Sequence, residues 1–275
     1  MWERLVRWGL EEDIGHGDLT TASVIPKDAV GRLALVARQP MVVAGLPALY
    51  AAFRVLEGGT VTLLATDGTW ISANTAVAWV SGRLESLLMA ERVILNILQR
   101  LSGIATMTRR VVEQIDGLPT KVLDTRKTTP GWRDVEKYAV RMGGGVNHRA
   151  GLDGGVLLKD NHIAAVGSIR GAVERVRATL GPLVAIEVEI DRLDQLDDAL
   201  AARPYAILLD NMSIDDLRIA VRAINHRAFV EASGNIRLDN VRAVAETGVD
   251  GVSLGWLTHS SPAVDIGADW GADGL

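Results

Sequence analysis

The chain contains no cysteine among its 275 residues. This absence excludes disulfide bonds, thiolate catalysis and cysteine-ligated zinc. Proteins of reducing compartments are typically free of disulfides, so we expect a cytoplasmic location. Aromatic residues are also scarce, at 4% of the chain against 48% hydrophobic residues overall. The interior must therefore be built mainly from aliphatic side chains.

Long apolar runs are missing as well. The two longest uncharged stretches, residues 39–53 and 68–82, have 15 residues each and contain glycine. A membrane-spanning helix needs about 20 apolar residues. The first residues, MWERLVRWGLEED, carry charges from the start and do not read as a signal peptide. We therefore expect a soluble protein with no membrane partner.

A general basic excess is the third absence. The net charge is −5 and the pI is near 5.6, which argues against a nucleic-acid-binding surface. Against this acidic background, six candidate cations gather in the words DTRKTTPGWR, VNHRAG and LLKDNH: Arg126, Lys127, His148, Arg149, Lys159 and His162. Arginine forks and lysine point charges suit carboxylate and phosphate oxygens. The sequence therefore predicts a small polyanionic substrate.

The first third of the chain mixes helical and strand patterns. Helices are expected over residues 2–12 and 46–57, and strands over 31–38 and 60–66. A long helical pattern runs over 84–116 and is interrupted at Ser102-Gly103. We interpret this interruption as a hinge between two domains.

After Lys121 the pattern changes to repeated strand–helix units. Apolar runs predict strands at 121–123, 155–158, 183–190, 205–209, 228–232 and 249–254. Glu189, Asp210 and Glu231 are spaced 21 residues apart, a rhythm typical of parallel strands joined by helices. Six or seven units are present, so we predict an α/β barrel that is incomplete.

Polar residues follow almost every predicted strand, and the carboxyl ends of barrel strands form active sites. Arg126 and Lys127 follow one strand and Lys159 another. Salt bridges at the rim are the alternative reading of these cations. His148-Arg149 lies beside Gly143-Gly144-Gly145, where either a ligand approaches the backbone or a helix ends.

Carboxylates are expected at the same carboxyl ends of the barrel strands. Glu187 and Glu189 are two apart on a strand and so share a face, which we expect to be the barrel interior. With Asp210 they form a set of oxygen ligands typical of Mg²⁺. A closed network of ion pairs without a ligand is the alternative.

Two late loops predict a phosphate site. Ser233-Gly234-Asn235 and Gly255 each follow a strand, and loops after the last two barrel strands often bind phosphate through backbone N–H groups. Ordinary turn chemistry is the alternative. Together, the pocket suits a phosphorylated, magnesium-bound donor and an anionic acceptor.

The order of these motifs is specific. They are DIGHGDLTT (13–21), NILQRLSGIAT (96–106), DTRKTTPG (124–131), EKYAVRMGGGVNHRAGL (136–152), LLKDNHI (157–163), EVEI (187–190), LLDNM (208–212), EASGN (231–235) and GWLTHSSPAVDI (255–266). By these motifs the chain resembles the quinolinate phosphoribosyltransferase family, the decarboxylating nicotinate-nucleotide pyrophosphorylases of NAD synthesis, nearly from end to end. It departs at Asn235, where a second glycine is common.

The resemblance implies a fold and a reaction. Residues 1–103 would form an N-terminal α/β sandwich domain, and 104–262 an incomplete barrel of six or seven strands, with 263–275 returning to the first domain. The reaction would transfer phosphoribosyl from phosphoribosyl pyrophosphate to quinolinate with loss of CO2, giving nicotinate mononucleotide and pyrophosphate. A homodimer is implied, in which each subunit completes the other's site.

The resemblance also implies residue roles. The quinolinate carboxylates would meet Arg126, His148, Arg149 and Lys159, and Arg100 of the partner subunit. Phosphoribosyl pyrophosphate would meet Thr125, Lys127, Glu189 and Asp210, and its 5′-phosphate would meet Ser233, Gly234, Asn235, Leu254, Gly255 and Trp256. Catalytic candidates are Lys159, Glu189 and Asp210, with the last two as Mg²⁺ ligands, directly or through water. Lys159 or a water would supply the proton that replaces CO2.

Four alternatives stay open. The first is the related molybdenum-operon protein, against which the intact words Thr125-Arg126-Lys127, Asn147-His148-Arg149 and Lys159-Asp160-Asn161-His162 argue. A nicotinate-specific transferase would need fewer cations. A Schiff-base aldolase would use Lys159 as its amine. A phosphate-binding barrel without catalysis is the fourth.

Overall fold

The structure, a computed structural model, describes residues 1–271. Residue contacts divide the chain into two compact units. The first unit contains Met1–Arg109, Thr128–Gly144 and residues 256–271, and the second contains Arg110–Lys127 and Gly145–Gly255. This division differs from the expected boundary at residue 103, because residues 128–144 join the first unit. Their helix α5 (Arg133–Met142) packs Val135, Ala139 and Val140 into the first unit's core.

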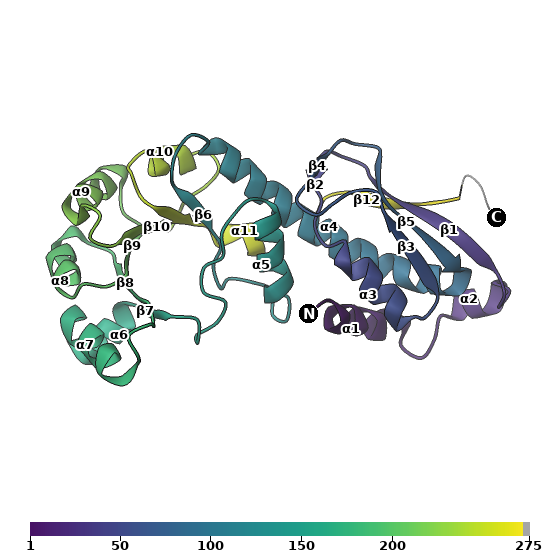
Figure 1. Ribbon diagram of the computed structural model, residues 1–275, viewed down its shortest axis with the longest axis horizontal. Helices are drawn as coiled ribbons and strands as arrows, with labels where there is room; N and C mark the ends of the chain where they lie inside the picture. Colours follow the sequence, from purple (N-terminus) through teal and green to yellow (C-terminus); the bar gives the residue numbers. More distant parts are fainter. Residues whose placement is uncertain (272–275) are drawn as a thin grey trace. The chain divides into compact units, whose positions relative to one another are not determined.

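The first unit is built on an antiparallel sheet of order β12-β1-β5-β3 (Figure 1). Its strands are β1 (Val30–Ala37), β3 (Gly59–Leu63), β5 (Thr75–Arg83) and β12 (Ile266–Trp270). A small pair, β2 (Met41–Val42) and β4 (Trp70–Ile71), lies apart from this sheet. The expected strands 31–38 and 60–66 correspond to β1 and β3. The pairing of β12 with β1 brings residues 266–270 to this unit, as expected for the stretch that begins at 263. Residues 272–275 of that expected stretch lie outside the described residues.

Helices cover this sheet with aliphatic side chains. They are α1 (Trp2–Ile14), α3 (Pro47–Val55) and the first part of α4 (Leu84–Gln114). The short helices α2 (Leu19–Val24) and α11 (Trp256–His259) also belong to the unit. Leu35, Leu49 and Leu98 are almost fully buried in one continuous core. The scarcity of aromatic residues is thus met by close aliphatic packing.

The expected hinge at Ser102-Gly103 is wrong, because α4 continues through both residues. The Ser102 hydroxyl donates to the Ala44 carbonyl and accepts from the Ala44 backbone N–H. A Cβ at Gly103 would overlap the Pro262 carbonyl oxygen. These small residues therefore allow close packing against the helix and do not interrupt it.

The second unit is a sheet of six parallel strands in the order β6-β11-β10-β9-β8-β7. The strands are β6 (Lys121–Leu123), β7 (Val156–Leu158), β8 (Ile186–Ile190), β9 (Ala206–Asp210), β10 (Phe229–Ser233) and β11 (Gly251–Ser253). Each of the six predicted apolar runs overlaps one of these strands, so the predicted fold class is confirmed. Helices α7 (Ile169–Thr179), α8 (Leu196–Ala201), α9 (Ile214–Ile224) and α10 (Val241–Ala245) lie along its outside (Figure 1). Two shorter segments complete the unit, α6 (Asp160–Val166) and the 3-10 turn η1 (Leu193–Gln195).

A further segment pairs with the edge strand β6. Val146 forms a parallel bridge with Leu123, and its backbone N–H donates to the Val122 carbonyl over 2.8 Å. This segment precedes His148 and Arg149. One of the cationic motifs is therefore attached to the edge of the sheet.

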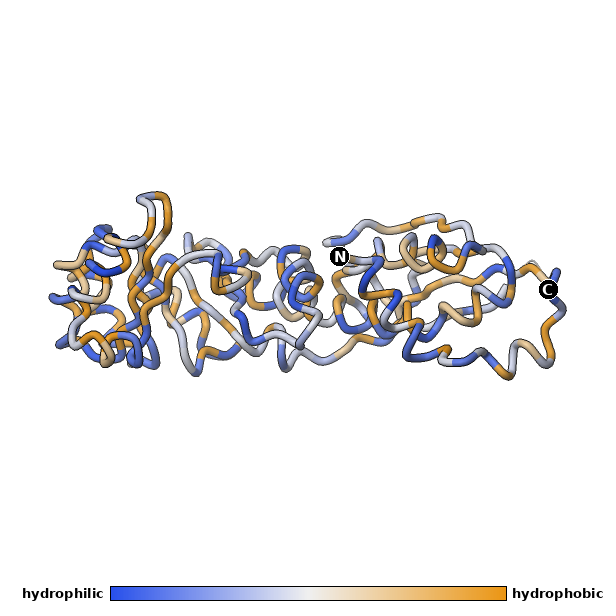
Figure 2. Tube along the Cα trace, turned by 90° about the horizontal axis from the view of Figure 1, so that it is seen from below, coloured by the Kyte–Doolittle hydropathy of each residue, from blue (hydrophilic) through white to orange (hydrophobic). Residues whose placement is uncertain are grey.

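No helix in the described part of the chain is long and apolar enough to cross a membrane. Hydrophobic and hydrophilic residues alternate over short distances along the trace (Figure 2).

Candidate active site

The carboxyl ends of the six parallel strands surround a pocket of about 630 Å³ in the second unit, which we call the mouth pocket. Its lining residues are Thr125, Arg126, Lys127, His148, Arg149, Leu157, Lys159, Glu189, Leu208, Asp210, Asn211, Glu231, Ser233, Gly234, Asn235 and Ser253. Most of the predicted site residues are thus brought together by strands that are far apart in sequence.

Cations from three motifs share this pocket. Arg126 and Lys127 lie in the loop after β6, where the Lys127 backbone N–H donates to the Thr125 hydroxyl over 3.0 Å. Arg149 lies after the Val146 segment, and its Nη1 donates to the Gly155 carbonyl over 2.8 Å. Burial lowers the pKa of Arg149, and the nearby Arg126 charge lowers it further. Two guanidinium groups this close repel each other, so an anion bound between them would be stabilised.

Acidic residues occupy the same pocket. Glu189 at the end of β8 accepts from Lys159 Nζ over 2.7 Å. Asp210 ends β9, and its Oδ2 accepts from the Asn211 amide over 2.9 Å. Cationic and anionic side chains therefore line one cavity. A closed network was the alternative, but Lys159 remains half-exposed, so the pair borders open space.

The loop after β10 has the backbone of an anion-binding turn. Gly234 and Asn235 both have positive φ, at 89° and 51°. Asparagine tolerates this region better than most residues, which explains Asn235 where a second glycine is common. The Asn235 side-chain amide donates to Asn211 Oδ1 over 2.9 Å. A tight turn after a late barrel strand can present backbone N–H groups to a phosphate.

His148 is held by two buried carboxylates. Its Nε2 lies 3.0 Å from Glu187 Oε2 and 3.4 Å from Glu231 Oε2. These hydrogen bonds raise the pKa of His148, with Glu187 contributing most. Burial raises the pKa of Glu187. The backbone N–H of Arg149 donates to Nδ1 over 2.9 Å, so in this arrangement Nδ1 accepts and Nε2 carries the N–H that faces the carboxylates.

Glu187 and Glu189 both face the barrel interior, as expected, but they line different cavities. Glu189 lines the mouth pocket, whereas Glu187 lines a second cavity of about 250 Å³ below it. Donor atoms of His148, Glu187 and Glu231 lie within 4.8 Å of one another, close enough for a metal ion. A ring held toward its protonated form by two carboxylates is a poor metal ligand.

Sequence reasoning missed Asp124 and Glu231 as site residues. The fully buried Asp124 carboxylate accepts from the Asn147 amide and from the His148 backbone N–H, the latter over 2.8 Å. The DTRK and NHR motifs are thus joined through one carboxylate. Glu231 lines the mouth pocket and contacts His148. The sequence signals were the place of Asp124 in DTRKTTPG and, for Glu231, its place in EASGN and in the 21-residue spacing with Glu189 and Asp210.

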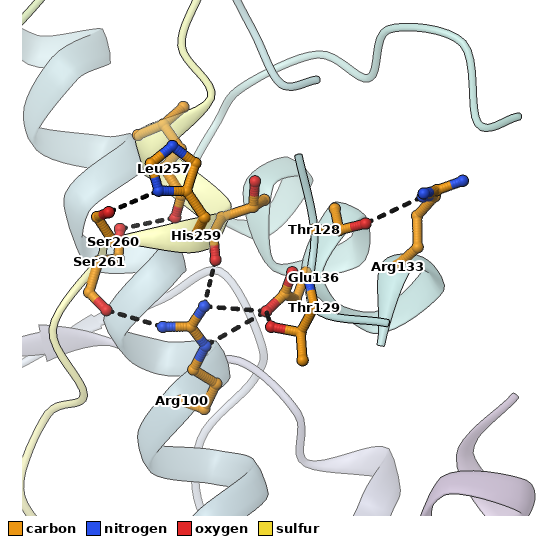
Figure 3. Close-up of polar contacts among 10 residues, drawn as sticks. Arg100, Thr128, Thr129, Arg133, Glu136, Leu257, His259, Ser260 and Ser261 are labelled. Carbon is orange, nitrogen blue, oxygen red and sulfur yellow. Dashed lines mark hydrogen bonds and ion pairs between the residues drawn. The ribbon is translucent and has the colours of Figure 1, made fainter. Parts of the chain in front are cut away.

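Arg100 does not lie in the mouth pocket but in the first unit, on α4 (Figure 3). Its Nη2 donates to Glu136 Oε1 over 3.0 Å and to the Thr258 carbonyl, and Nη1 donates to the Ser261 carbonyl over 2.9 Å. Glu136 is fully buried and also accepts from Thr129. The expected role of Arg100 in a partner's site stays a prediction.

Three other expected residues do not line the pocket: Leu254, Gly255 and Trp256. Leu254 is only 1% exposed, and its backbone N–H donates to the Leu123 carbonyl over 3.0 Å. Its side chain is part of the core, so it is unsuited to contact a phosphate. Ser253, at the end of β11, lines the pocket in their place.

Gly143, the first of the three glycines before the NHR motif, serves packing. Gly143 is the C-cap of α5, and a Cβ there would come within 2.5 Å of the Ala105 carbonyl oxygen. Of the two readings, the end of a helix is therefore correct for Gly143.

A hollow of about 720 Å³ lies at the opposite, amino-terminal ends of β8 and β9. It is lined mainly by apolar residues of the 176–186 stretch and by Arg203, Pro204 and Tyr205. Arg177 there is engaged with the carbonyls of Ala202 and Arg203. Among residues 1–271, none with a carboxylate side chain lines this hollow. The chemistry therefore favours the mouth pocket.

Comparison with known proteins agrees along nearly the whole chain. Residues 18–102 match the model of the quinolinate phosphoribosyl transferase N-terminal domain, and 104–269 match that of its C-terminal domain. A probable nicotinate-nucleotide pyrophosphorylase (carboxylating) from Synechocystis is 46% identical over 95% of this chain and 90% of its own. The nicotinate-nucleotide pyrophosphorylase (carboxylating) of Mycobacterium leprae is 43% identical over 96% and 95%. The solved structure of the Francisella tularensis nicotinate-nucleotide pyrophosphorylase superposes with a TM-score of 0.94 at 39% identity, covering 98% and 96% of the chains.

Proposed function

The chain belongs to the quinolinate phosphoribosyltransferase family, and from this premise we propose that the mouth pocket is where it joins quinolinate to phosphoribosyl pyrophosphate. The reaction is a phosphoribosyl transfer of NAD synthesis that yields nicotinate mononucleotide, pyrophosphate and CO2. The observation that supports this location is that guanidinium, ammonium and carboxylate groups line one cavity at the carboxyl ends of the strands.

The acceptor binds at the cationic side of the pocket. Quinolinate is a dianion, and Arg126, Arg149 and Lys159 offer charges that suit two carboxylates. Holding the pyridine nitrogen near the anomeric carbon turns a bimolecular reaction into an effectively unimolecular one. A monoacid such as nicotinate would leave part of this charge unpaired, which favours the diacid.

The donor binds at the acidic and glycine-containing side. Its 5′-phosphate meets the Ser233-Gly234-Asn235 turn, and Lys127 and Thr125 contact the pyrophosphate end. Glu189 and Asp210 supply oxygen ligands of the kind that Mg²⁺ prefers, directly or through water, so the donor set fits this ion. When bound, Mg²⁺ supplies positive charge to the leaving pyrophosphate.

The chain's residues then stabilise the charge that develops at C1′ of the ribose and on the pyridine ring. The C1′–O bond to pyrophosphate breaks as the ring nitrogen forms a bond to C1′, and the carboxylates nearby stabilise the oxocarbenium character. The ribosylated ring is cationic, so the electron pair left at C2 when CO2 departs is stabilised by the adjacent positive nitrogen. A proton from Lys159 or a bound water completes the product. Arg126 and Arg149 retain the remaining carboxylate.

We also propose a homodimer in which Arg100 of the partner subunit completes each pocket, and a cytoplasmic site of action. The cysteine-free composition supports the second statement. The homodimer is supported by the position of Arg100 within NILQRLSGIAT, a motif that the chain shares with the family.

Turnover tests the reaction directly. The protein is incubated with quinolinate, phosphoribosyl pyrophosphate and magnesium, while CO2 and nicotinate mononucleotide are followed. We expect both products in equal amounts, and no reaction when nicotinate replaces quinolinate. Turnover of nicotinate but not of quinolinate would overturn the assignment. Borohydride with a carbonyl substrate tests the aldolase alternative; no adduct is expected, because Lys159 is ion-paired with Glu189.

A further inference from the structure

Both ring nitrogens of His148 already have partners inside the second unit. Nε2 faces Glu187 and Glu231, and Nδ1 accepts from the Arg149 backbone N–H over 2.9 Å. In this arrangement neither nitrogen directs an N–H at a substrate carboxylate. The contribution of His148 therefore comes from what it holds in place.

The two carboxylates are deeply buried, at 8% exposure for Glu187 and 2% for Glu231. A buried carboxylate is costly unless it is paired. Among residues 1–271, His148 is the one basic residue whose side chain lies within 4.0 Å of either carboxylate, and its Nε2 faces both of them. The upward shift in the pKa of His148 agrees with this pairing. The pair of carboxylates and the ring thus depend on each other.

These contacts connect distant parts of the barrel. Glu187 lies on β8 and Glu231 on β10, whereas His148 belongs to the segment that pairs with the edge strand β6. The same segment carries Arg149, whose guanidinium reaches the Gly155 carbonyl just before β7. The carboxylates therefore hold, across the barrel interior, the backbone from which Arg149 projects.

The position of Glu187 indicates that it supports other residues of the site and does not contact the substrate itself. His148, Arg149 and Glu231 line both the mouth pocket and the 250 Å³ cavity below it, whereas Glu187 lines only the lower cavity. Its neighbour Glu189 lines only the mouth pocket. Two glutamates on one strand are thus directed to different tasks.

We propose that Glu187 and Glu231 are positioning residues of the acceptor wall, which hold the His148 ring and thereby direct Arg149 at the quinolinate carboxylates. The inference rests on the proposed function, because it assumes that Arg149 contacts quinolinate. It assigns no role in donor binding to either glutamate. Loss of either carboxylate should therefore weaken quinolinate binding selectively.

The first experiment compares Glu187→Gln and Glu231→Gln with wild type, measuring KM for each substrate and kcat. We expect the quinolinate KM to rise by about tenfold or more, as for a buried charge pair that loses one partner, with the donor KM within about twofold of wild type. Glu189→Gln, the same substitution two residues along β8, should instead raise the donor KM. The exposed Glu174→Gln, paired only with Arg170 on α7, is the control and should match wild type. Equal rises in both KM values, or no rise in Glu187→Gln and Glu231→Gln, would overturn the proposal.

A double-mutant cycle tests whether the effect passes through His148. Glu231→Gln is combined with His148→Gln, and quinolinate KM is measured for both single variants and the double variant. If Glu231 acts through the ring, the double variant should resemble His148→Gln alone, within about twofold. Additive effects would show that Glu231 acts by another route.

Folding and function are separated by two further measurements. Thermal unfolding identifies any variant that fails to fold. If Glu187→Gln does so, Glu231→Gln carries the test, because its contact with His148 is longer. Absence of turnover in both wild type and Glu174→Gln would defeat the proposed function itself. Normal turnover in wild type without the KM split defeats only the positioning role.

Discussion

At the scale of single residues, the site depends on side chains whose roles are set by burial. Glu187 and Glu189 are both glutamates on β8, yet one is buried against His148 and the other pairs with the half-exposed Lys159. The alternation of a strand predicted their common face. The alternation could not predict that the two glutamates line different cavities, because those cavities are also formed by β10 and by the segment that carries His148 and Arg149.

Gly234 offers a test of the phosphate turn. A Cβ there would overlap the Asn211 side chain and come within 2.9 Å of its backbone nitrogen, and φ is +89°. Gly234→Ala should therefore displace the turn and raise the donor KM by about tenfold, the loss of one or two oriented N–H contacts. The quinolinate KM should stay near that of wild type. Steady-state kinetics with each substrate varied in turn measures both.

The matched control is Gly181→Ala, where an added Cβ has nothing within 4 Å. It should leave both KM values unchanged. An unchanged donor KM in Gly234→Ala would remove the turn from the donor site.

At the scale of elements, the parallel strands were easier to predict than the antiparallel ones. The six strands of the second unit are short apolar runs ending in polar residues, a pattern typical of barrels. The strand β5 (Thr75–Arg83) was not predicted, because its alanines and glycine lack a strong strand signal. Strand β12 contains Gly267 and Asp269 and is defined by its pairing with β1, a contact more than 200 residues away in sequence.

Helix α4 shows why a local signal can mislead. Ser-Gly normally weakens a helix, yet here the backbone near Pro262 requires the missing side chain. Packing overrides propensity at this point.

Gly103→Ala measures that packing. Alanine gains about 1 kcal/mol of helix propensity over glycine, but its methyl group would overlap the Pro262 carbonyl oxygen. Overpacking of a buried site costs about 1–3 kcal/mol, so we expect a net loss of stability in urea unfolding. A stabilised variant would show that the segment at Pro262 moves away at little cost.

At the scale of the whole molecule, composition and motif order determined most of what could be predicted. The acidic net charge made the cationic motifs conspicuous, and the apolar rhythm indicated the barrel. The expected contact of Arg100 with quinolinate cannot be tested in a single chain, because Arg100 does not line the mouth pocket of its own chain. Its guanidinium is bound by Glu136 and two carbonyls of its own unit, leaving part of its hydrogen-bonding capacity for another group (Figure 3).

Mixed dimers test the shared site. At a quinolinate concentration near the wild-type KM, Arg100→Ala and Arg149→Ala are each expected to be nearly inactive alone. After unfolding and refolding together in equal amounts, heterodimers should contain one intact site, because Arg149 of one chain meets Arg100 of the other. Half of the dimers with one of two sites intact would restore about a quarter of wild-type activity in a two-fold symmetric dimer. If no activity returns although heterodimers form, Arg100 acts within its own chain or not at all.

The central claim is that one pocket has a cationic wall for the diacid and a separate wall for the phosphoribosyl donor. The most direct measurement is the pair of KM values for Arg149→Ala, set beside those for Lys127→Ala. Arg149→Ala removes a charged partner of a quinolinate carboxylate, so its quinolinate KM should rise by about a hundredfold while its donor KM changes little. Lys127→Ala should show the reverse. Equal losses for both substrates in Arg149→Ala would contradict the division of the pocket.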